Sequence, residues 1–363
     1  MQLDSLLNDF VPLMIFRIQL VGDAMKLGSL KRGRDGALIV VSRDLTRGIE
    51  VPEIAATMQR AVDEWSECRP LLEAVYEQLN AGNQDGCFEL NVDNLAAPFP
   101  RAYQFADGSA YVRHVELVRR ARGAVLPDSY WSDPLIYQAG SDGFMGPNDP
   151  IFLQDESFGI DFEAELVGVT DDVPMGTKEH DANQHFILFM LINDVSLRNL
   201  IPAELKKEFG FFQGKSASTL SPVAVTPDEF GDAWNGETLD LAITSTLRGE
   251  LFGQPKVSVD QTFTLNRLLE HCAKTRKLGA GTLIGTGTIS NATPGAGFSC
   301  IAEVRAVETI EKGAPETSFM KFGDRIRIEM FRNDRTSIFG AIDQTVERYE
   351  LGAAQRKESG AYG

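Results

Sequence analysis

Hydrophobic and polar residues alternate most regularly in the segment Lys321–Met330, near the end of the chain. Its apolar residues Ile326, Ile328 and Met330 are separated by charged ones. A period of two is that of a β-strand with one buried face, so this segment is expected to form a strand. Shorter apolar runs between turn residues predict further strands at 167–169, 186–192, 239–246 and 282–284.

A helical period occurs nearer the start of the chain. Five apolar residues share one helix face there, at spacings of three and four: Ile54, Met58, Ala61, Val62 and Trp65. We expect Pro70 to interrupt this helix and a second amphipathic piece to end at Leu79. The run 37–41 predicts a strand before it. After residue 120, the clearest helical pattern is 262–277.

These patterns predict two structural units and a separate N-terminal segment. Residues 25–100 are interpreted as a small α+β domain, because a strand and two helical pieces precede a turn-rich stretch. Residues 101–363 contain most of the predicted strands and are expected to form a mainly β domain. Residues 1–24 are set apart either as an N-terminal extension or as the result of a misplaced initiation codon, because Met25 has the features of a natural start.

Composition narrows the classes of partner. The 363 residues carry a formal net charge of -17, from 35 Lys and Arg against 52 Asp and Glu. Such an acidic surface repels phosphate backbones, which argues against a nucleic-acid partner. No apolar stretch approaches the roughly 20 residues that a membrane span needs. The four cysteines have neither disulfide nor zinc spacing, so a cytoplasmic protein without a membrane partner is expected.

Paired carboxylates are the sharpest local signal for chemistry. On a strand, Glu163 and Glu165 would point to the same side, about 7 Å apart. They would repel each other unless a cation lay between them, and hard divalent cations prefer oxygen ligands. Such a pair is also common on solvated strand faces. Asp194 follows the apolar run 186–192 and is a candidate third ligand, or else a turn residue or helix N-cap.

Further candidates each have an ordinary structural explanation as well. Lys215 follows Gly214 and two aromatic residues; in a desolvated pocket it would stabilise developing negative charge, and at the surface it would be an ordinary lysine. His114, with Glu116 nearby, is a candidate general base or a surface residue of a short helix. The Gly- and Thr-rich stretch 281–288 lacks nucleotide-binding spacing, and its backbone is expected to approach a ligand closely instead.

In their order along the chain, these elements resemble the fumarylacetoacetate hydrolase family. The matching positions are His114, Glu163-Ala-Glu165, Asp194, Gly214-Lys215-Ser216 and Thr286-Gly-Thr288. The resemblance covers residues 101–345, and the part from residue 25 resembles the N-terminal domain of the longer, two-domain bacterial members. It implies a catalytic domain of β-roll or mixed β-sandwich type behind a small α+β domain, assembled as a homodimer.

Carried over position by position, the resemblance implies a metal centre with a substrate site beside it. The implied metal ligands are Glu163, Glu165, Asp194 and, as a fourth acid, Asp107. The ion would be Mg²⁺, with Mn²⁺ or Ca²⁺ as alternatives. His114 would activate water, and Lys215 would stabilise an enolate or oxyanion. The implied substrate-side residues are Tyr137, Thr288 and Arg198, of which Arg198 would orient Asp194.

One departure from the family pattern concerns the partner of His114. Shorter members have His-x-x-Glu, whereas Leu117 takes that place here and Glu116 lies one residue earlier. Glu163 or another acid is therefore an alternative partner for the histidine.

The resemblance predicts a hydrolase that cleaves a C–C bond in a β-diketo acid, fumarylacetoacetate or a related acylpyruvate, in tyrosine or aromatic-compound catabolism. A decarboxylase, hydratase or isomerase of 2-oxo acids on the same centre is the alternative, because all of these need the same enolate. A third hypothesis is a non-catalytic protein that binds a structural Ca²⁺. In each enzymatic case the partner is a small acid.

Overall fold

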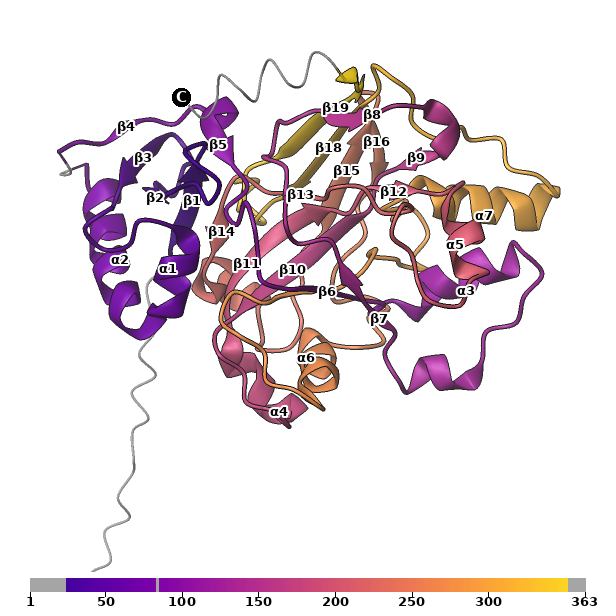
Figure 1. Cartoon of the computed structure of the whole chain (residues 1–363), viewed down its shortest axis with the longest axis horizontal. Coiled ribbons are helices and arrows are strands. Elements are labelled where there is room, and N and C mark those ends of the chain that lie inside the picture. Colours follow the sequence, from indigo (N-terminus) through magenta and orange to yellow (C-terminus); the bar gives the residue numbers. More distant parts are fainter. Residues whose placement is uncertain (1–23, 83–84, 352–363) are drawn as a thin grey trace, which may run out of the picture.

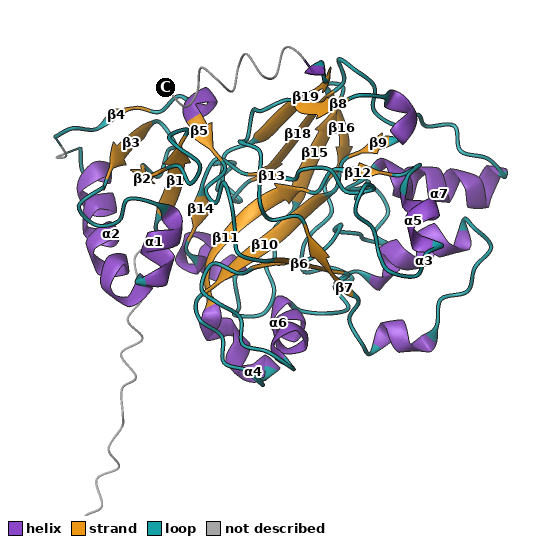
Figure 2. Cartoon of the chain, viewed as in Figure 1, coloured by secondary structure: helices purple, strands orange, loops and turns teal. Residues whose placement is uncertain are grey.

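The computed structural model describes residues 24–82 and 85–351 (Figure 1). Strands occupy the middle of the molecule and helices lie mainly at its periphery (Figure 2). The described strands form sheets of twelve, five and two strands. The predicted mainly β architecture with α+β elements is therefore confirmed. Residues 1–23 of the predicted N-terminal extension lie outside the described residues.

The large sheet runs through the whole molecule. Its strand order is β4 (Phe88–Glu89), β3 (Arg47–Glu50), β2 (Ala37–Val41), β1 (Lys26–Leu30), β14 (Ala224–Val225), β11 (Phe186–Asn193), β10 (Ala164–Thr170), β17 (Leu283–Gly285), β6 (Phe105–Gly108) and β7 (Ile136–Ala139). Two short strands join it at the side, β13 (Thr219–Leu220) on β11 and β5 (Leu95–Ala96) on β1. Strands from both sides of residue 100 share this sheet, and that domain boundary stays a prediction.

The two other sheets are smaller. The five-stranded sheet has the order β16 (Glu250–Gly253), β15 (Ile243–Leu247), β18 (Arg325–Met330), β19 (Ile342–Arg348) and β8 (Ile151–Leu153). The two-stranded sheet pairs β12 (Ser196–Leu197) with β9 (Ile160–Asp161). The strand expected at 239–246 begins only at Ile243, whereas the other predicted strands form as β2, β10, β11, β17 and β18.

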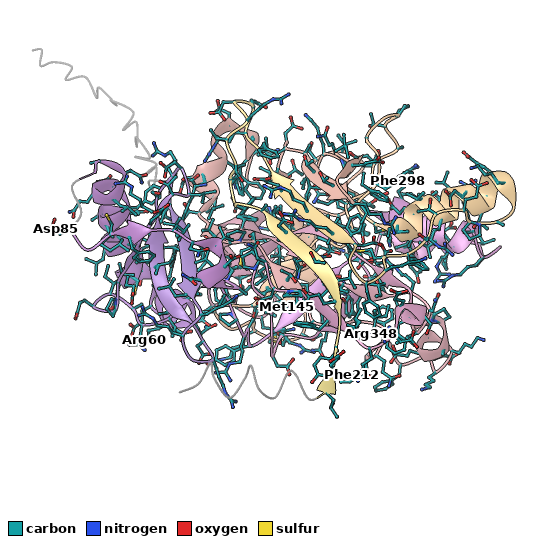
Figure 3. All side chains as sticks on the ribbon, turned by 90° about the horizontal axis from the view of Figure 1, so that it is seen from above. Arg60, Asp85, Met145, Phe212, Phe298 and Arg348 are labelled. Atoms are coloured by element: carbon teal, nitrogen blue, oxygen red, sulfur yellow. The ribbon has the colours of Figure 1, made fainter. Side chains whose placement is uncertain are left out.

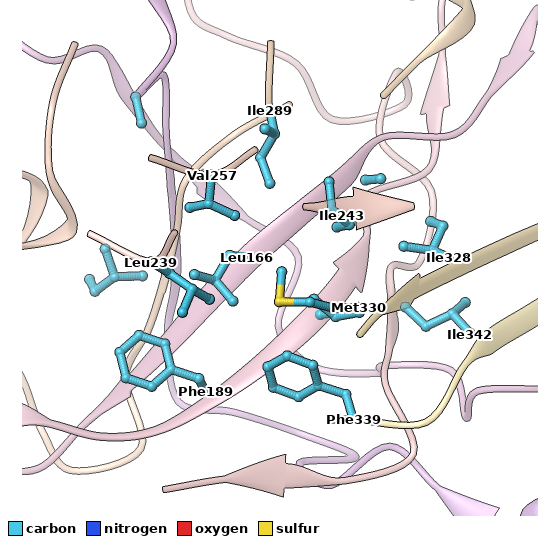
Figure 4. Close-up of a cluster of buried hydrophobic side chains, with 14 of the residues drawn as sticks. Leu166, Phe189, Leu239, Ile243, Val257, Ile289, Ile328, Met330, Phe339 and Ile342 are labelled. Carbon is cyan, nitrogen blue, oxygen red and sulfur yellow. The ribbon is translucent and has the colours of Figure 1, made fainter. Parts of the chain in front are cut away.

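The apolar run of β11 is continuous because both faces of this strand are buried. Phe189 and Leu191 belong to one hydrophobic core, and Leu188, Met190 and Ile192 to the other. The first core fills the space between the large sheet and the five-stranded sheet, where Leu166, Phe189, Ile328, Met330 and Phe339 converge (Figure 4). These packed sheets fix the ends of β10 and β11, from which the candidate site is built.

The second core lies under the N-terminal helices α1 (Met58–Asp63) and α2 (Trp65–Asn80). The expected interruption at Pro70 is wrong, because α2 continues through this residue. The break falls instead at Glu64, whose φ of -120° and ψ of 37° are not helical. Proline lacks one N–H donor, but the buried face of α2 continues across it, since Cys68, Leu72, Tyr76 and Leu79 all pack inward.

Five further helices are described, and three of them lie together on the side opposite the N-terminal elements (Figure 1). These three are α3 (Val112–Arg120), α5 (Ile201–Leu205) and α7 (Ile301–Lys312). The others are α4 (Glu179–Ala182) and α6 (Leu265–Ala273), of which α6 is the helix expected within 262–277. Among the described residues, no helix is both long and apolar enough to span a membrane.

A buried charged cluster joins the N-terminal strands to the rest of the molecule. Lys26 on β1 lies with its Nζ 3.4 Å from Glu229 Oε2, and neither side chain is exposed. The hydroxyl of Tyr76 donates to Glu229 Oε1 at 2.8 Å, and Arg332 pairs with Oε2. Lys26 also donates to the carbonyl of Ile338. Every oxygen of this carboxylate therefore has a partner.

Candidate functional site

Adjacent strands of the large sheet bring three distant carboxylates together. Asp107 lies on β6 opposite Tyr137 of β7 and Gly285 of β17. Glu165 lies on β10, and Asp194 directly follows β11, the neighbour of β10. One carboxylate oxygen from each acid lies within 4.8 Å of the others, and all three residues are buried. The structure thus brings Asp107, Glu165 and Asp194 into one cluster.

Glu163 lies beside this cluster, held by two cations. Its Oε1 accepts from Arg198 Nη2 at 2.6 Å and its Oε2 from Lys215 Nζ at 2.5 Å. The same ammonium group lies 2.5 Å from Asp194 Oδ2 and so connects Glu163 to the three-carboxylate cluster. The role of Glu163 as a direct metal ligand stays a prediction.

The electrostatics of the cluster show an excess of negative charge. Four carboxyl groups, those of 107, 163, 165 and 194, face Lys215 and Arg198, and Arg198 is shared with Asp161, so negative charges outnumber positive ones when all are ionised. Burial, with the Asp194 carboxylate next, raises the pKa of Asp107 to about 8. Burial and the charge of Asp107 also raise the pKa of Glu165 well above its usual range. Both carboxyl groups therefore lack a compensating charge.

Glu163 and Lys215 show the opposite response, because they are paired. Burial alone would raise the pKa of Glu163, but Arg198 and Lys215 outweigh it and hold that pKa below its ordinary value. Burial alone would lower the pKa of Lys215, but the carboxylates of Asp194 and Glu163 raise it instead. Lys215 therefore carries its positive charge at neutral pH.

A divalent cation fits this donor set. Both carboxylate oxygens of Glu165 are buried without a hydrogen-bond partner among the described residues. An unpartnered buried carboxylate is costly, and a cation between it, Asp107 and Asp194 would supply positive charge that these carboxylates lack. All donors are carboxylate oxygens, which suit Mg²⁺, Mn²⁺ and Ca²⁺.

Two glycines of the Gly- and Thr-rich stretch make room for Asp107. A Cβ at Gly285 would lie 2.3 Å from Asp107 Oδ1, so no larger residue fits there. The backbone N–H of Gly287, whose φ is +70°, donates to the same oxygen at 3.1 Å. This stretch, which was expected to approach a ligand, approaches a carboxylate of the candidate centre.

The partner of His114 is an acid that the sequence did not reveal. His114 Nδ1 lies 3.0 Å from Oε1 of Glu303, a buried residue of α7, and neither Glu116 nor Glu163 makes this contact. Nδ1 also lies 4.0 Å from the Sγ of Cys300. The sequence did contain a signal for α7, because an amphipathic segment is followed by Gly313, the residue type that commonly ends helices. In the structure this glycine adopts the left-handed conformation typical of such ends. Glu303, a glutamate on the buried face of this helix, was therefore a candidate site residue.

A second missed residue, Asp161, links the two parts of the site. Its Oδ1 accepts from the N–H of Ile301 at 2.7 Å and its Oδ2 from that of Ala302 at 2.9 Å. These are free donors at the start of α7, where a carboxylate is favoured. Oδ2 also accepts from Arg198 Nε at 2.8 Å. Asp161 therefore fixes both the helix that carries Glu303 and the arginine that holds Glu163.

The three residues that the resemblance implies for substrate binding, Tyr137, Arg198 and Thr288, differ in their hydrogen bonding. Tyr137 donates its hydroxyl to Asp194 Oδ2 at 2.7 Å, and Ser218 donates to the other oxygen at 2.6 Å. Arg198 directs its hydrogen bonds to Asp161 and Glu163 rather than to Asp194. Thr288 is buried after β17, and none of the hydrogen bonds of the described residues joins it to these carboxylates. Substrate contact by these three residues stays a prediction.

An aromatic loop borders the site. Phe211 packs edge-on against the ring of Tyr137, with ring centroids 5.0 Å apart. Lys215 Nζ lies 5.5 Å from the centre of the same ring. The neighbouring Phe212 is 88% exposed at the edge of the molecule (Figure 3). Aromatic rings therefore border one side of the candidate site.

Comparison with known families identifies the class of this protein. The family model described as "Fumarylacetoacetate (FAA) hydrolase C-terminal" matches residues 104–347, and the one described as "Fumarylacetoacetase N-terminal domain 2" matches residues 25–101. Together they span most of the chain. The chain therefore belongs to the fumarylacetoacetate hydrolase family, as the order of its motifs predicted.

Curated relatives have several names. The chain is 29% identical over 210 residues to "Fumarylacetoacetate hydrolase domain-containing protein 2 homolog" of Dictyostelium discoideum, covering 54% of this chain and 60% of that protein. It is 26% identical over 244 residues to "Oxaloacetate tautomerase YisK" of Bacillus subtilis, covering 66% and 71%.

A solved structure shows the same fold. The fumarylacetoacetate hydrolase from Exiguobacterium antarcticum superimposes with a TM-score of 0.60 at 18% identity, covering 90% of this chain and 100% of that one. At this identity the likeness concerns the fold alone.

Proposed function

We propose that this protein is a divalent-metal-dependent enzyme that binds a small 2-oxo or β-diketo acid and stabilises its enolate. The observation that carries the proposal is the Asp107, Glu165 and Asp194 cluster, whose buried Glu165 oxygens have no partner among the described residues. A cation held there would act as a Lewis acid toward the carbonyl oxygen of such a substrate.

The residues around the cluster supply the remaining functions. Glu303 accepts a hydrogen bond from Nδ1–H of His114, which leaves Nε2 as the nitrogen that takes up a proton. Lys215, buried and cationic, is the group that stabilises negative charge as it develops on the substrate oxygen. Tyr137 and Ser218 hold Asp194 in place.

The reaction that we favour is keto–enol tautomerisation of a 2-oxo dicarboxylic acid. In this reaction His114 removes a proton from the carbon next to the carbonyl and returns one to the oxygen or carbon of the enolate. The name of the Bacillus subtilis relative supports this choice. The same histidine would remove a proton from water in the alternative reaction, hydrolytic cleavage of a β-diketo acid.

C–C bond hydrolysis is the second candidate, because the family model that matches most of the chain takes its name from it. A role in tyrosine or aromatic-compound catabolism would follow only from this second reaction. The homodimer and the cytoplasmic location also remain predictions.

One experiment separates these reactions. Purified protein is incubated with Mg²⁺ or Mn²⁺ and either enol-oxaloacetate or an acylpyruvate, with and without EDTA. Tautomerisation removes the ultraviolet absorbance of the enol without changing the composition of the substrate, whereas hydrolysis yields two acids. Activity that EDTA does not reduce, or no activity on either class of substrate, would refute the proposal.

A further inference from the structure

The structure contains a second group of side chains that could hold a metal ion, and the proposed reaction does not use all of it. His114 Nδ1, Glu303 Oε1 and Cys300 Sγ lie within 4.8 Å of one another. The carboxylate is 3.0 Å and the sulfur 4.0 Å from the same ring nitrogen. Cys300 and Glu303 are buried, whereas the side chain of His114 is 18% exposed. An ion would therefore approach past the histidine.

The chemistry of these donors differs from that of the carboxylate cluster. One nitrogen, one sulfur and one oxygen are the ligands of Zn²⁺ and the softer Cd²⁺, whereas Mg²⁺ and Ca²⁺ prefer oxygen alone. Tetrahedral zinc bonds place nitrogen and sulfur ligands about 3.6 Å apart, and nitrogen and oxygen ligands about 3.3 Å apart. The separations of 4.0 and 3.0 Å differ from these values by a few tenths of an ångström. Small side-chain rotations would complete the geometry.

We propose that His114, Cys300 and Glu303 form a binding site for a thiophilic divalent cation of the Zn²⁺ class, and that its occupation inhibits the enzyme. The protein supplies three ligands, and the fourth position is left to water. The carboxylate cluster, made only of oxygen donors, keeps its own hard cation. The two centres are therefore distinguished by the softness of the metal.

Inhibition follows from the tautomer of the histidine. In the resting pair Nδ1 carries the proton and donates it to Glu303, which leaves Nε2 free as the base. A cation on Nδ1 requires the imidazole proton to reside on Nε2, so the ring can no longer accept one there. The thiol of Cys300 loses its proton to solvent as the sulfur–metal bond forms. No oxidation or reduction takes place.

The inhibitory part of this inference rests on the proposed role of His114, and the binding part does not. Binding is therefore tested by a signal that needs no substrate. A thiolate bound to Cd²⁺ absorbs in the ultraviolet, and Cd²⁺ is added to the full-length chain saturated with Mg²⁺. The Cys87→Ser background is used, because Cys87 is an exposed thiol. We expect an absorbance increase that saturates at one Cd²⁺ per chain.

Substitutions then show which side chains produce the Cd²⁺ absorbance signal. Cys300→Ser should abolish the absorbance change, whereas Cys272→Ser should keep it. Glu303→Gln retains the thiol and should weaken Cd²⁺ binding by about 10- to 100-fold, while Glu311→Gln, an exposed residue of the same helix, should leave it unchanged. Absence of the signal in the parent protein, or its persistence in Cys300→Ser, would overturn the site. If Cys300→Ser does not fold, the two glutamate variants decide the question.

Inhibition is then measured with Zn²⁺ at saturating Mg²⁺, with each variant compared with its own rate without zinc. We expect the parent rate to fall at least about tenfold, and the rate of Cys300→Ser to be insensitive at the same concentration. A cadmium signal without loss of activity would overturn the inhibitory role alone. An enzyme inactive on every 2-oxo acid would refute the proposed function and leave the cadmium result intact.

Discussion

Two buried charged clusters in this molecule have opposite character. In the cluster of Lys26, Tyr76, Glu229 and Arg332, a single carboxylate is surrounded by two cations and a hydroxyl. In the candidate centre, carboxylates outnumber cations, and Glu165 has no partner among the described residues. Burial is similar in both, so burial by itself does not identify a functional site. The two clusters differ instead in whether their carboxylates have a counter-charge.

The comparison also explains the energetics of each cluster. Glu229 connects β1 and α2 to the segment that follows β14, so its partners are parts of the fold. Its loss would leave the buried Lys26 and the partly exposed Arg332 without a counter-charge. Glu165 lacks such partners, and burial beside the Asp107 carboxylate raises the pKa of its carboxyl group well above the usual range. One cluster has its charges matched within the fold, and the other has carboxylates without a counter-charge.

Glu229→Gln should produce the largest effect on stability. Breaking a buried ion pair leaves Lys26 and Arg332 without a counter-charge, which costs about 3–5 kcal/mol of unfolding free energy. Urea unfolding of the metal-free protein measures this loss. Glu237→Gln, an exposed neighbour without a side-chain contact in the described part of the chain, should change stability by less than about 0.5 kcal/mol. Equal values for both variants would contradict a stabilising cluster.

Lys215→Met should produce the largest effect on activity. Loss of one charge-stabilising donor costs about 10²–10³ in kcat, or about 2.7–4 kcal/mol. The measurement is kcat on the substrate found active, and the unfolding free energy is measured beside it to establish that the variant is folded under the assay conditions. Lys207→Met, an exposed lysine after α5, is the matched control and should retain full activity. An active Lys215→Met enzyme would remove this lysine from the mechanism.

Glu165→Gln is the direct counterpart of Glu229→Gln, because the chemical change is identical. It should leave the metal-free protein within about 1 kcal/mol of the parent, since the carboxyl group there has no partner to lose. The parent should gain about 2.7 kcal/mol from Mg²⁺ at 100 times its Kd, and the variant should gain nothing at that concentration. Urea unfolding with and without Mg²⁺ gives both quantities. Retained stabilisation by Mg²⁺ would show that the ion binds elsewhere.

The smallest predicted effect tests whether Glu303 or Glu116 is the partner of His114. Glu303→Gln should lower kcat by about 10- to 100-fold, because the neutral amide no longer fixes the histidine tautomer or stabilises its protonated form. Glu116→Gln should leave kcat within about twofold of the parent, since Glu116 does not contact the ring nitrogen in the described structure. The pH profile of kcat should shift only in Glu303→Gln. The reverse pattern would restore Glu116 as the partner.

The secondary structure of contiguous segments was predicted well, because the spacing of apolar residues along a segment reflects which of its faces is buried. The apolar run of β11 and the alternation in β18 showed their strands. The order of Glu163, Glu165, Asp194 and Lys215 along the chain indicated the family, and the structure brings these four residues into one neighbourhood. Pro70 shows the limit of local reasoning, because a helix-breaking residue is tolerated where the helix face stays packed.

The sequence by itself determined the fold class and the family, since both depend on residue types, their local spacing and their order along the chain. The metal ligands stay a prediction. Only the tertiary structure determined which side chains contact one another at the site. Glu303 lies 189 residues from His114, and Asp161 lies 140 residues from the helix start that it holds. No periodicity connects such distant positions, because their contacts depend on how the strands pair and the helices pack. The same pairing leaves Glu229 fully matched and Glu165 without a partner in the described chain, although both are buried glutamates.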